Sequence, residues 1–381
     1  MRRTGLIVVA SILFSLGLVM IFNTNSAEIL DLGLDRSPHL AIIKQLIYAA
    51  LGWFLAGFIQ KMGVRRFIRY SPLALFLLTL FLALCFVPGI GKVVNGSHRW
   101  IVLAGISFQP SEFVKYVIPA YFILRISQTE TFSSANLFYA LGAIAIPMAL
   151  ILFEPNNGTV AVILATLFAL CFLSEIPLKY WALPLCIILC LGVAAAWQLP
   201  YVRGRLQVYL NPELDVRGRG HQPLQAKIAA GSGKLFGKGP GNSLQKLSYL
   251  PEAQNDYIAA IYAEEFGFVG ISSLILLYLV ITYLGYSQAY HAASREEALM
   301  AASAMFLITF QAFLNLGVVS GLLPSTGLNL PFFSQGGTSL IANIMGLALI
   351  INVKVRERDG KASHYQRWRI GRTLVSRSGA R

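Results

Sequence analysis

Charged residues are scarce in this chain of 381 residues: Asp, Glu, Lys and Arg together make up 13% of it, where a soluble domain usually has about 25%. Apolar residues make up 56% and the mean hydropathy is +0.63. This composition excludes a soluble or disordered protein. Uncharged stretches of about 20 residues, the length that crosses a bilayer, recur along the chain. The sequence therefore predicts a polytopic membrane protein.

Cysteine is also scarce. The four cysteines are Cys85, Cys171, Cys186 and Cys190, and all lie inside apolar stretches. Neither a disulfide framework nor a zinc site is expected from such positions. The net charge is +14. In a membrane protein, basic residues are typically concentrated on the cytoplasmic side. We therefore expect no nucleic-acid partner.

Hydropathy predicts an all-α fold with ten transmembrane helices. Basic residues concentrate at both chain ends and in the connections on the same side, so the positive-inside rule places both termini in the cytoplasm. We expect one transmembrane domain, 1–353, and a basic cytoplasmic tail, 354–381. The predicted spans are Gly5–Phe22, His39–Ile59, Ser71–Pro88, Pro110–Leu124, Leu137–Phe153, Gly158–Leu173, Trp181–Gln198, Ala263–Tyr286, Leu299–Leu322 and Thr338–Val353.

One long connection, 199–257, falls on the extracytoplasmic side and is rich in Gly, Pro and basic residues. Its stretch 231–243 superficially suggests a nucleotide-binding loop, but Gly239 follows Lys238 where such a loop requires Ser or Thr. Flexible backbone beside Lys234, Lys238 and Lys246 suits a phosphate-bearing ligand. A plain solvated basic loop is the alternative.

Asp256 lies where this connection enters a predicted span. A carboxylate at the membrane interface is either a general base or a helix cap. Glu264 and Glu265 follow about 12 Å deeper along the helix, at 1.5 Å per residue. Carboxylates inside a span are usually functional or paired.

A third group of polar residues precedes the predicted span Pro110–Leu124. Arg99 lies at the interface, and Glu112 and Lys115 are three residues apart on one helix face. They either pair with each other or face a polar cavity that leads to Asp256.

No charged residue or histidine occurs between Leu299 and Val353. Yet the middle of this stretch, 320–339, is dense in Pro, Gly and Ser and cannot be a lipid-facing helix. Irregular backbone at membrane depth is tolerated only when it is buried in protein or lines a wet cavity. A re-entrant or cavity-lining hairpin is therefore predicted, with an external loop as the alternative.

Together these motifs resemble the SEDS family of bacterial shape, elongation, division and sporulation proteins, which includes the FtsW, RodA and SpoVE branches. The resemblance covers nearly the whole chain, and the stretch 241–253 is most similar to the FtsW branch. The matching segments are 95–101, 109–115, 231–237, 241–253, Asp256, 264–267, 321–327 and 336–339.

The resemblance implies a glycosyltransferase of the inner membrane that polymerises lipid II into peptidoglycan strands during cell division. Asp256 would be the catalytic residue, on the extracytoplasmic side. The implied partners are a class B penicillin-binding protein, which is a transpeptidase, and other divisome or elongasome membrane proteins. A divalent cation, Mg or Mn, is a candidate cofactor. Expected substrate-binding residues are Arg99, Glu112, Lys115, Lys234, Lys238, Lys246, Glu252 and Ser339.

Two departures from the family pattern bear on the site. Gln254 and Asn255 replace a common His-Thr, which weakens any proton relay through position 254. Asn156 replaces an acid, and Glu154 is a candidate substitute.

Three other functions remain open. A lipid II flippase would use Glu264, Glu265 and the uncharged 299–353 segment as its path. A non-catalytic scaffold for the transpeptidase would tolerate loss of Asp256. A RodA-like enzyme would serve elongation instead of division.

Overall fold

The chain forms a helical bundle, seen here in a computed structural model. The structure describes residues 2–33, 35, 37–94, 97–103, 106–128, 134–198, 203–204, 207, 209–210, 220–247, 249–250 and 253–356. The helices are α1 (Arg2–Asp31), α2 (His39–Met62), α3 (Val64–Leu84), α4 (Pro110–Ser127), α5 (Ser134–Phe153), α6 (Asn157–Leu173), α7 (Leu178–Gln198), α9 (His221–Ser232), α10 (Ile258–Tyr290), α11 (Arg295–Val319) and α12 (Gly337–Ile351).

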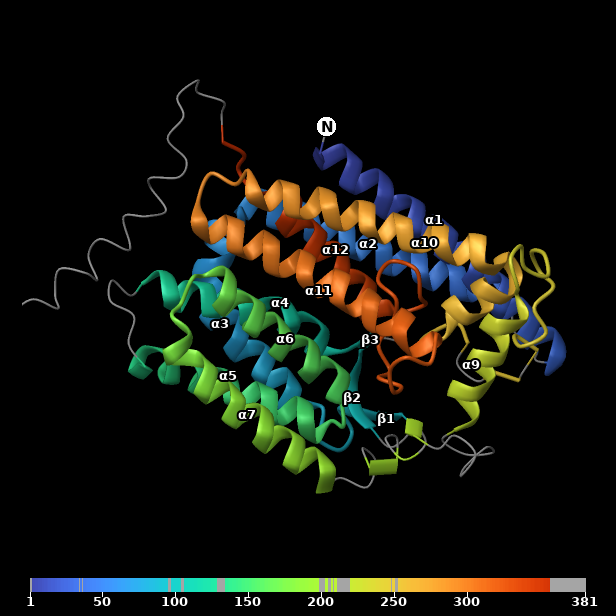
Figure 1. Cartoon of the computed structure of the whole chain (residues 1–381), viewed down its shortest axis with the longest axis horizontal. Helices are drawn as coiled ribbons and strands as arrows, with labels where there is room; N and C mark the ends of the chain where they lie inside the picture. The colour runs from blue at the N-terminus through green and yellow to red at the C-terminus, as the bar shows by residue number, and fades with distance from the viewer. Residues whose placement is uncertain are drawn as a thin grey trace, which may run out of the picture.

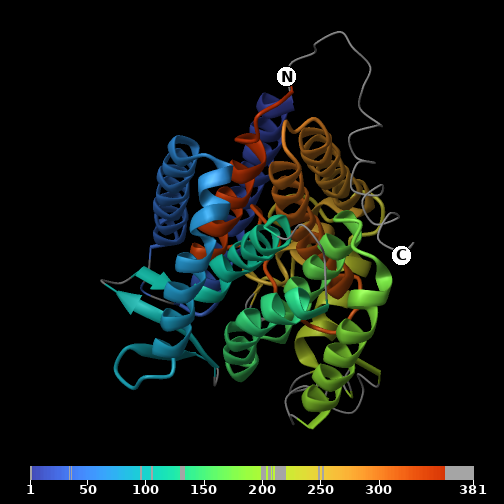
Figure 2. The same cartoon turned by 90° about the vertical axis from the view of Figure 1, so that its left-hand side faces the viewer.

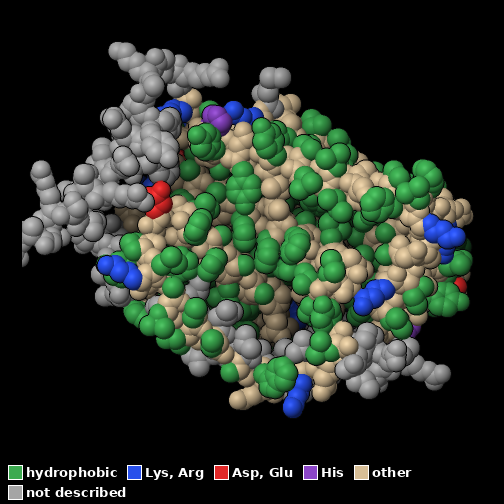
Figure 3. Space-filling view, in the orientation of Figure 1, with side chains coloured by type: hydrophobic (Ala, Val, Ile, Leu, Met, Phe, Trp, Pro, Cys, Tyr) green, Lys and Arg blue, Asp and Glu red, His purple; other side chains and the backbone are tan. Residues whose placement is uncertain are grey.

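Each of the ten predicted spans overlaps one of these helices, and the helical membrane fold is confirmed. Among the described residues, five helices are long and apolar enough to cross a membrane: α1, α2, α3, α10 and α11. Shorter apolar helical stretches lie in α5, α6 and α12. Figure 3 shows hydrophobic side chains over the middle of one face, with most charged ones towards the ends of the molecule. This is the surface expected of a multi-pass membrane protein.

Helix α11 lies inside the bundle and is the most buried of the five long apolar helices. It contacts α10 and α12 on one side and α4 and α6 on the other (Figures 1 and 2). Buried polar side chains on α11 therefore reach segments that are far apart in the sequence.

A small sheet was not predicted. Its strands β1 (Gly91–Val94), β2 (Ser97–Leu103) and β3 (Ile106–Phe108) pair antiparallel in the order β1-β2-β3. The sheet meets the helices at Ser107, which bonds to Tyr48 of α2 and Thr338 of α12. Arg99 belongs to β2 of this sheet, which precedes α4 in the chain.

The predicted irregular segment is present between α11 and α12, at 320–336, and its second half is buried. Leu328, Leu330 and Phe333 are at most 3% exposed. Amide side chains satisfy its backbone, as expected for irregular chain away from water: Gln311 and Asn315 of α11 donate to Asn329 O and Leu328 O, respectively.

The predicted span Ser71–Pro88 is displaced in the structure. Helix α3 begins earlier, at Val64, and ends at Leu84. The left-handed Gly63 (φ 82°) separates it from α2. Its first two turns therefore include Arg65, Arg66 and Arg69, which lie in a connection between the predicted spans.

The contact between α1 and the 320–336 segment depends on a glycine. A Cβ on Gly17 would lie 2.4 Å from Phe333 O, whereas one on Gly57 of α2 would meet nothing within 4 Å. We expect Gly17→Ala to lower the free energy of unfolding by about 1–3 kcal/mol through overpacking. Gly57→Ala should leave it unchanged or raise it by up to about 1 kcal/mol.

Thermal unfolding of the two purified variants in one detergent checks this pair. Equal melting temperatures would contradict the close packing of α1 against Phe333.

Candidate active site

Asp256 lies two residues before α10 and is partly exposed. Its Oδ2 atom is 3.6 Å from the point where a Cβ on Gly327 would stand. Gly327 has φ +70° and belongs to the irregular segment, so the carboxylate faces that segment. The N-cap residue of α10 is Tyr257, which makes no side-chain capping bond. The structure therefore does not place Asp256 as the helix cap.

Asn315 of α11 fixes the backbone at Asp256. Its Nδ2 atom donates to Asp256 O at 2.8 Å and to Leu328 O at 2.7 Å. The next residue, Tyr257, donates from its hydroxyl to Ser325. On the same stretch, Gln254 O accepts from Gln335 N. The chain around Asp256 is thus bound to the irregular segment at three points.

Glu112 and Lys115 form an ion pair, the first of the two alternatives left open by the sequence, with Lys115 Nζ 2.8 Å from Glu112 Oε2. Both are buried, and the ammonium also donates to Gln311 Oε1 at 2.8 Å. Gln311 in turn donates to Asn329 O. Since Gln311 and Asn315 are one turn apart on α11, the buried ion pair and Asp256 are connected through one helix face and the irregular segment.

The glycine-rich stretch 233–241 inserts into a break in α10 at Gly267, where φ is 65° and ψ is −161°. In a continuous helix Phe268 N would donate to Glu264 O, and Val269 N to Glu265 O. Here Lys238 N and Gly239 N donate to those two carbonyls instead. Phe268 N and Val269 N donate to Lys234 O and Leu235 O.

This insertion requires glycine on both sides. A Cβ on Gly237 would lie 2.1 Å from Glu265 O, and one on Gly267 would lie 2.3 Å from Gly237 N. The bonds and the close approach fix the glycine-rich stretch against α10, and with it the start of the chain that leads to Asp256.

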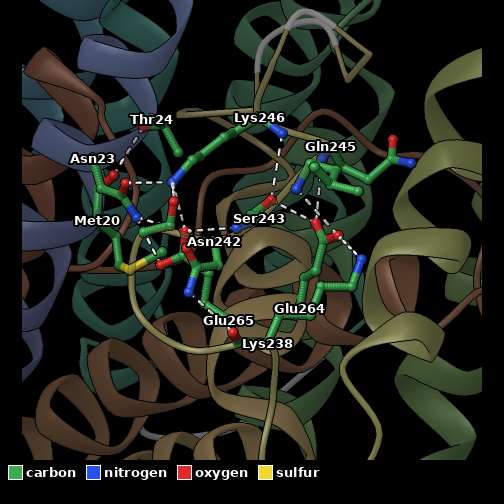
Figure 4. Close-up of polar contacts among 12 residues, drawn as sticks. Met20, Asn23, Thr24, Lys238, Asn242, Ser243, Gln245, Lys246, Glu264 and Glu265 are labelled. Atoms are coloured by element: carbon green, nitrogen blue, oxygen red, sulfur yellow. Dashed lines mark hydrogen bonds and ion pairs between the residues drawn. The ribbon is translucent and has the colours of Figure 1, made fainter.

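Side chains reinforce the same junction (Figure 4). Glu264 accepts from Lys238 Nζ at 2.6 Å and from Ser243 Oγ. Glu265 is turned the other way, towards Lys246 Nζ at 2.9 Å and Asn23 Nδ2 of α1. Both carboxylates are at most 1% exposed, and of the two alternatives left open by the sequence, functional or paired, the structure shows them paired.

Lys246 uses its whole donor capacity in this junction. Its ammonium contacts Glu265, Asn23 and Gly241 O, all at 2.6–2.9 Å. An ammonium has three N–H donors, so this arrangement holds the loop together. Lys234, in contrast, is exposed at the tip of the glycine-rich stretch.

Arg99 supports the connection between α5 and α6. Its guanidinium donates to Glu154 O at 2.9 Å and to Pro155 O at 2.5 Å. Asn156, where the family pattern has an acid, is buried and donates to Ser111. The carboxyl of Glu154 is also buried, and burial raises its pKa to about 8 although the charge of Arg99 acts to lower it.

Two expected substrate residues remain. Ser339 of α12 is buried and accepts from Asn343, whose Oδ1 accepts from the Tyr116 hydroxyl of α4. Glu252 lies outside the described residues.

The described residues contain no group of three or more His, Cys, Asp and Glu side chains that could hold a metal ion. A magnesium ion is commonly bound by one or two carboxylates together with substrate phosphates. Asp256 therefore fits a divalent cation only as one ligand beside a phosphate-bearing substrate.

Sequence reasoning missed Asn23, Gln311 and Asn315. Polar amides within apolar helices were a signal, since buried amides need partners, but nothing in the sequence said which partners these would be.

Comparison with known proteins gives consistent matches over nearly the whole chain. Residues 3–359 match the family of FtsW, RodA and SpoVE, described as "Cell cycle protein". The chain is 34% identical to stage V sporulation protein E of Bacillus subtilis over 351 residues, covering 91% of this chain and 95% of that protein. It is 37% identical to "Probable peptidoglycan glycosyltransferase FtsW" of Saccharophagus degradans over 361 residues, covering 91% and 90%.

A solved structure also matches. It was described under "Structural coordination of polymerization and crosslinking by a peptidoglycan synthase complex" and superposes with a TM-score of 0.70 at 27% identity. The match covers 91% of this chain and 96% of the other.

Removing one member of the buried Lys246–Glu265 pair should be costly. We expect Lys246→Met to lower the free energy of unfolding by about 3–5 kcal/mol, because Glu265 would keep a buried charge without its cation. Lys234→Met, at an exposed lysine, should change it by less than about 0.5 kcal/mol. Thermal unfolding in detergent measures both.

Adding Glu265→Gln to Lys246→Met removes the uncompensated charge and should restore part of the loss. If Lys246→Met alone melted like the wild type, the pair would not stabilise the junction.

The raised pKa of Glu154 predicts a pH dependence of stability. The unfolded chain loses this proton near pH 4.5 and the folded chain near pH 8, so the contribution of Glu154 to stability falls by up to about 1.4 kcal/mol per pH unit between them. Melting temperatures of the wild type should therefore fall across this window, relative to those of Glu154→Gln. Parallel profiles for the two proteins would show that Glu154 is ionised in the fold.

Proposed function

Because the chain belongs to the FtsW, RodA and SpoVE family of cell cycle proteins, we propose that it is a peptidoglycan glycosyltransferase that polymerises lipid II. The observation that carries the proposal is the placement of Asp256. This carboxylate is partly exposed, and its backbone is bound by Asn315 at the junction of α10 and the irregular segment. The relative from Saccharophagus degradans bears the name of this activity.

In the proposed reaction Asp256 is the general base. It takes the proton from the 4-hydroxyl of the acceptor sugar, and the oxygen attacks the anomeric carbon of the donor. The bond from that carbon to the pyrophosphate breaks, and its electron pair leaves with undecaprenyl pyrophosphate. Attack opposite to the leaving group inverts the anomeric centre. A diphosphate is already a good leaving group, so the enzyme supplies mainly a base and positive charge.

The cations around the site divide into two groups by their contacts. Lys115, Lys238 and Lys246 are each bound to a carboxylate, and we assign them to holding the site in shape. Lys234 is exposed, and its charge remains free to meet the pyrophosphate of the substrate. A divalent cation, Mg or Mn, would bind to that pyrophosphate and neutralise part of its charge.

The proposal places the protein in the bacterial inner membrane, with both termini in the cytoplasm and Asp256 outside. Its proposed partner is a class B penicillin-binding protein, because the matching solved structure belongs to a peptidoglycan synthase complex. Relatives named FtsW support a role in division, and the relative from Bacillus subtilis extends the candidates to sporulation.

The flippase alternative depended on Glu264 and Glu265 along a transport path. Both carboxylates instead hold the glycine-rich stretch through Lys238 and Lys246. Such fixed pairs favour a structural role for the two residues, and hence the polymerase.

We expect Asp256→Asn to fold and to bind its partner but to lose at least about a hundredfold in polymerisation rate, the usual contribution of a general base. The assay incubates purified protein, with and without the cognate transpeptidase, with labelled lipid II and either Mg or Mn. A gel then resolves glycan chain length. Asp31→Asn, at the exposed end of α1, is the matched carboxylate-to-amide control.

Full activity of Asp256→Asn would exclude the proposed base. An inactive wild type that moves lipid II across proteoliposomes would instead be a flippase. An inactive wild type that only stimulates cross-linking by its partner would be a scaffold.

A further inference from the structure

The tip of the glycine-rich stretch exposes apolar side chains next to the break in α10. Leu235, Phe236, Phe268 and Val269 are 53%, 77%, 63% and 50% exposed, respectively. They are neighbours because Phe268 N and Val269 N donate to Lys234 O and Leu235 O. We refer to these four residues as the tip patch.

The part of α10 that follows the break, 268–290, is by itself long enough to cross the bilayer. At 1.5 Å per residue it extends about 35 Å, and the hydrocarbon core is about 30 Å thick. The uncharged stretch of α10 begins at Phe266 and continues to its end at Tyr290. About 20 residues counted back from Tyr290 reach Gly270. The tip patch therefore lies within about a turn of the membrane boundary.

Helix α1 marks the same level independently. Its apolar run Gly5–Phe22 ends just before Asn23, and Asn23 bonds to Glu265, the last charged residue before the uncharged part of α10. Two adjacent helices thus change from polar to apolar at one level. Glu264 and Glu265 lie on its polar side and the tip patch lies on its apolar side.

The surroundings of the patch match a lipid interface. Lys234 and Lys238 flank Leu235 and Phe236 in the sequence, and basic side chains beside apolar ones are typical of segments that lie in the head-group region. The exposed face of α10 also continues away from the patch through Leu276 and Tyr283, which are 59% and 73% exposed. The patch is the end of a surface that faces lipid.

We propose that the tip patch inserts into the bilayer at the level of the lipid head groups, with Lys234 at the level of the lipid phosphates, which it contacts when no lipid-linked substrate is bound. The glycine-rich stretch is then anchored on two sides, by α10 and by the membrane. This contact sets the height of the chain that leads to Asp256 relative to the lipid surface. It concerns the bulk bilayer and does not depend on the reaction proposed for Asp256.

Depth measurement by spin labelling tests the proposal. The four native cysteines are replaced by alanine, and a nitroxide is attached to Phe236→Cys in the full-length protein in phosphatidylglycerol-containing vesicles. Leu276→Cys, mid-way along the uncharged part of α10, is the control inside the bilayer. Leu30→Cys, eight residues beyond Phe22 on α1 and 82% exposed, is the control in water.

The readout is the ratio of collisions with oxygen, which dissolves in lipid, to collisions with a water-soluble nickel complex. We expect the ratio at position 236 to be several-fold above that at position 30 and below that at position 276. Adding Lys234→Glu should lower it, because the new carboxylate repels anionic lipid, whereas Lys234→Gln should lower it less.

A ratio at position 236 equal to that at position 30 would place the tip patch in water and overturn the proposal. An immobilised label that neither reagent reaches would show that protein covers the patch. Loss of oxygen collisions at position 236 alone on adding a class B transpeptidase would assign the patch to that partner. No substrate is present, so failure of the polymerase assay would leave this result unaffected.

Discussion

The break in α10 at Gly267 is the constraint on which the site depends. The break leaves two carbonyls and two N–H groups without their helical partners, and a backbone group that is buried away from water without a partner costs several kcal/mol. The glycine-rich stretch supplies all four partners, from Lys234, Leu235, Lys238 and Gly239. The break and the loop are therefore stable only together, and the position of one fixes the other.

A second set of contacts reaches Asp256 from the opposite direction, and it uses amides instead of charges. Asn315 and Gln311 satisfy the carbonyls of Asp256, Leu328 and Asn329 from the interior of α11. Neutral amides suit this depth because a buried charge without a partner is far more costly than a buried dipole. The buried cation Lys115 accordingly has both a carboxylate and an amide oxygen as acceptors.

Hydropathy alone predicted the ten spans, because length and lack of charge are strong signals for membrane helices. The spacing of Glu112 and Lys115 on one helix face made their pairing one of two alternatives, but it could not exclude a polar cavity. The sheet at 91–108 was not predictable, because its strands are short and their contacts lie at distant positions such as Tyr48 and Thr338. Likewise Asn23 and Glu265 are 242 positions apart, so their bond could not be inferred from local patterns.

The two sets of contacts hold the described carboxylates of this region in two different ways. Glu264, Glu265 and Glu112 each have a lysine partner, whereas Asp256 is held through its backbone carbonyl. A hydrogen bond to the main chain of Asp256 fixes the point from which its side chain starts. A general base requires a fixed position together with oxygens that can accept a proton. The backbone bond from Asn315 meets the first requirement, and the partial exposure of Asp256 beside the irregular segment suits the second.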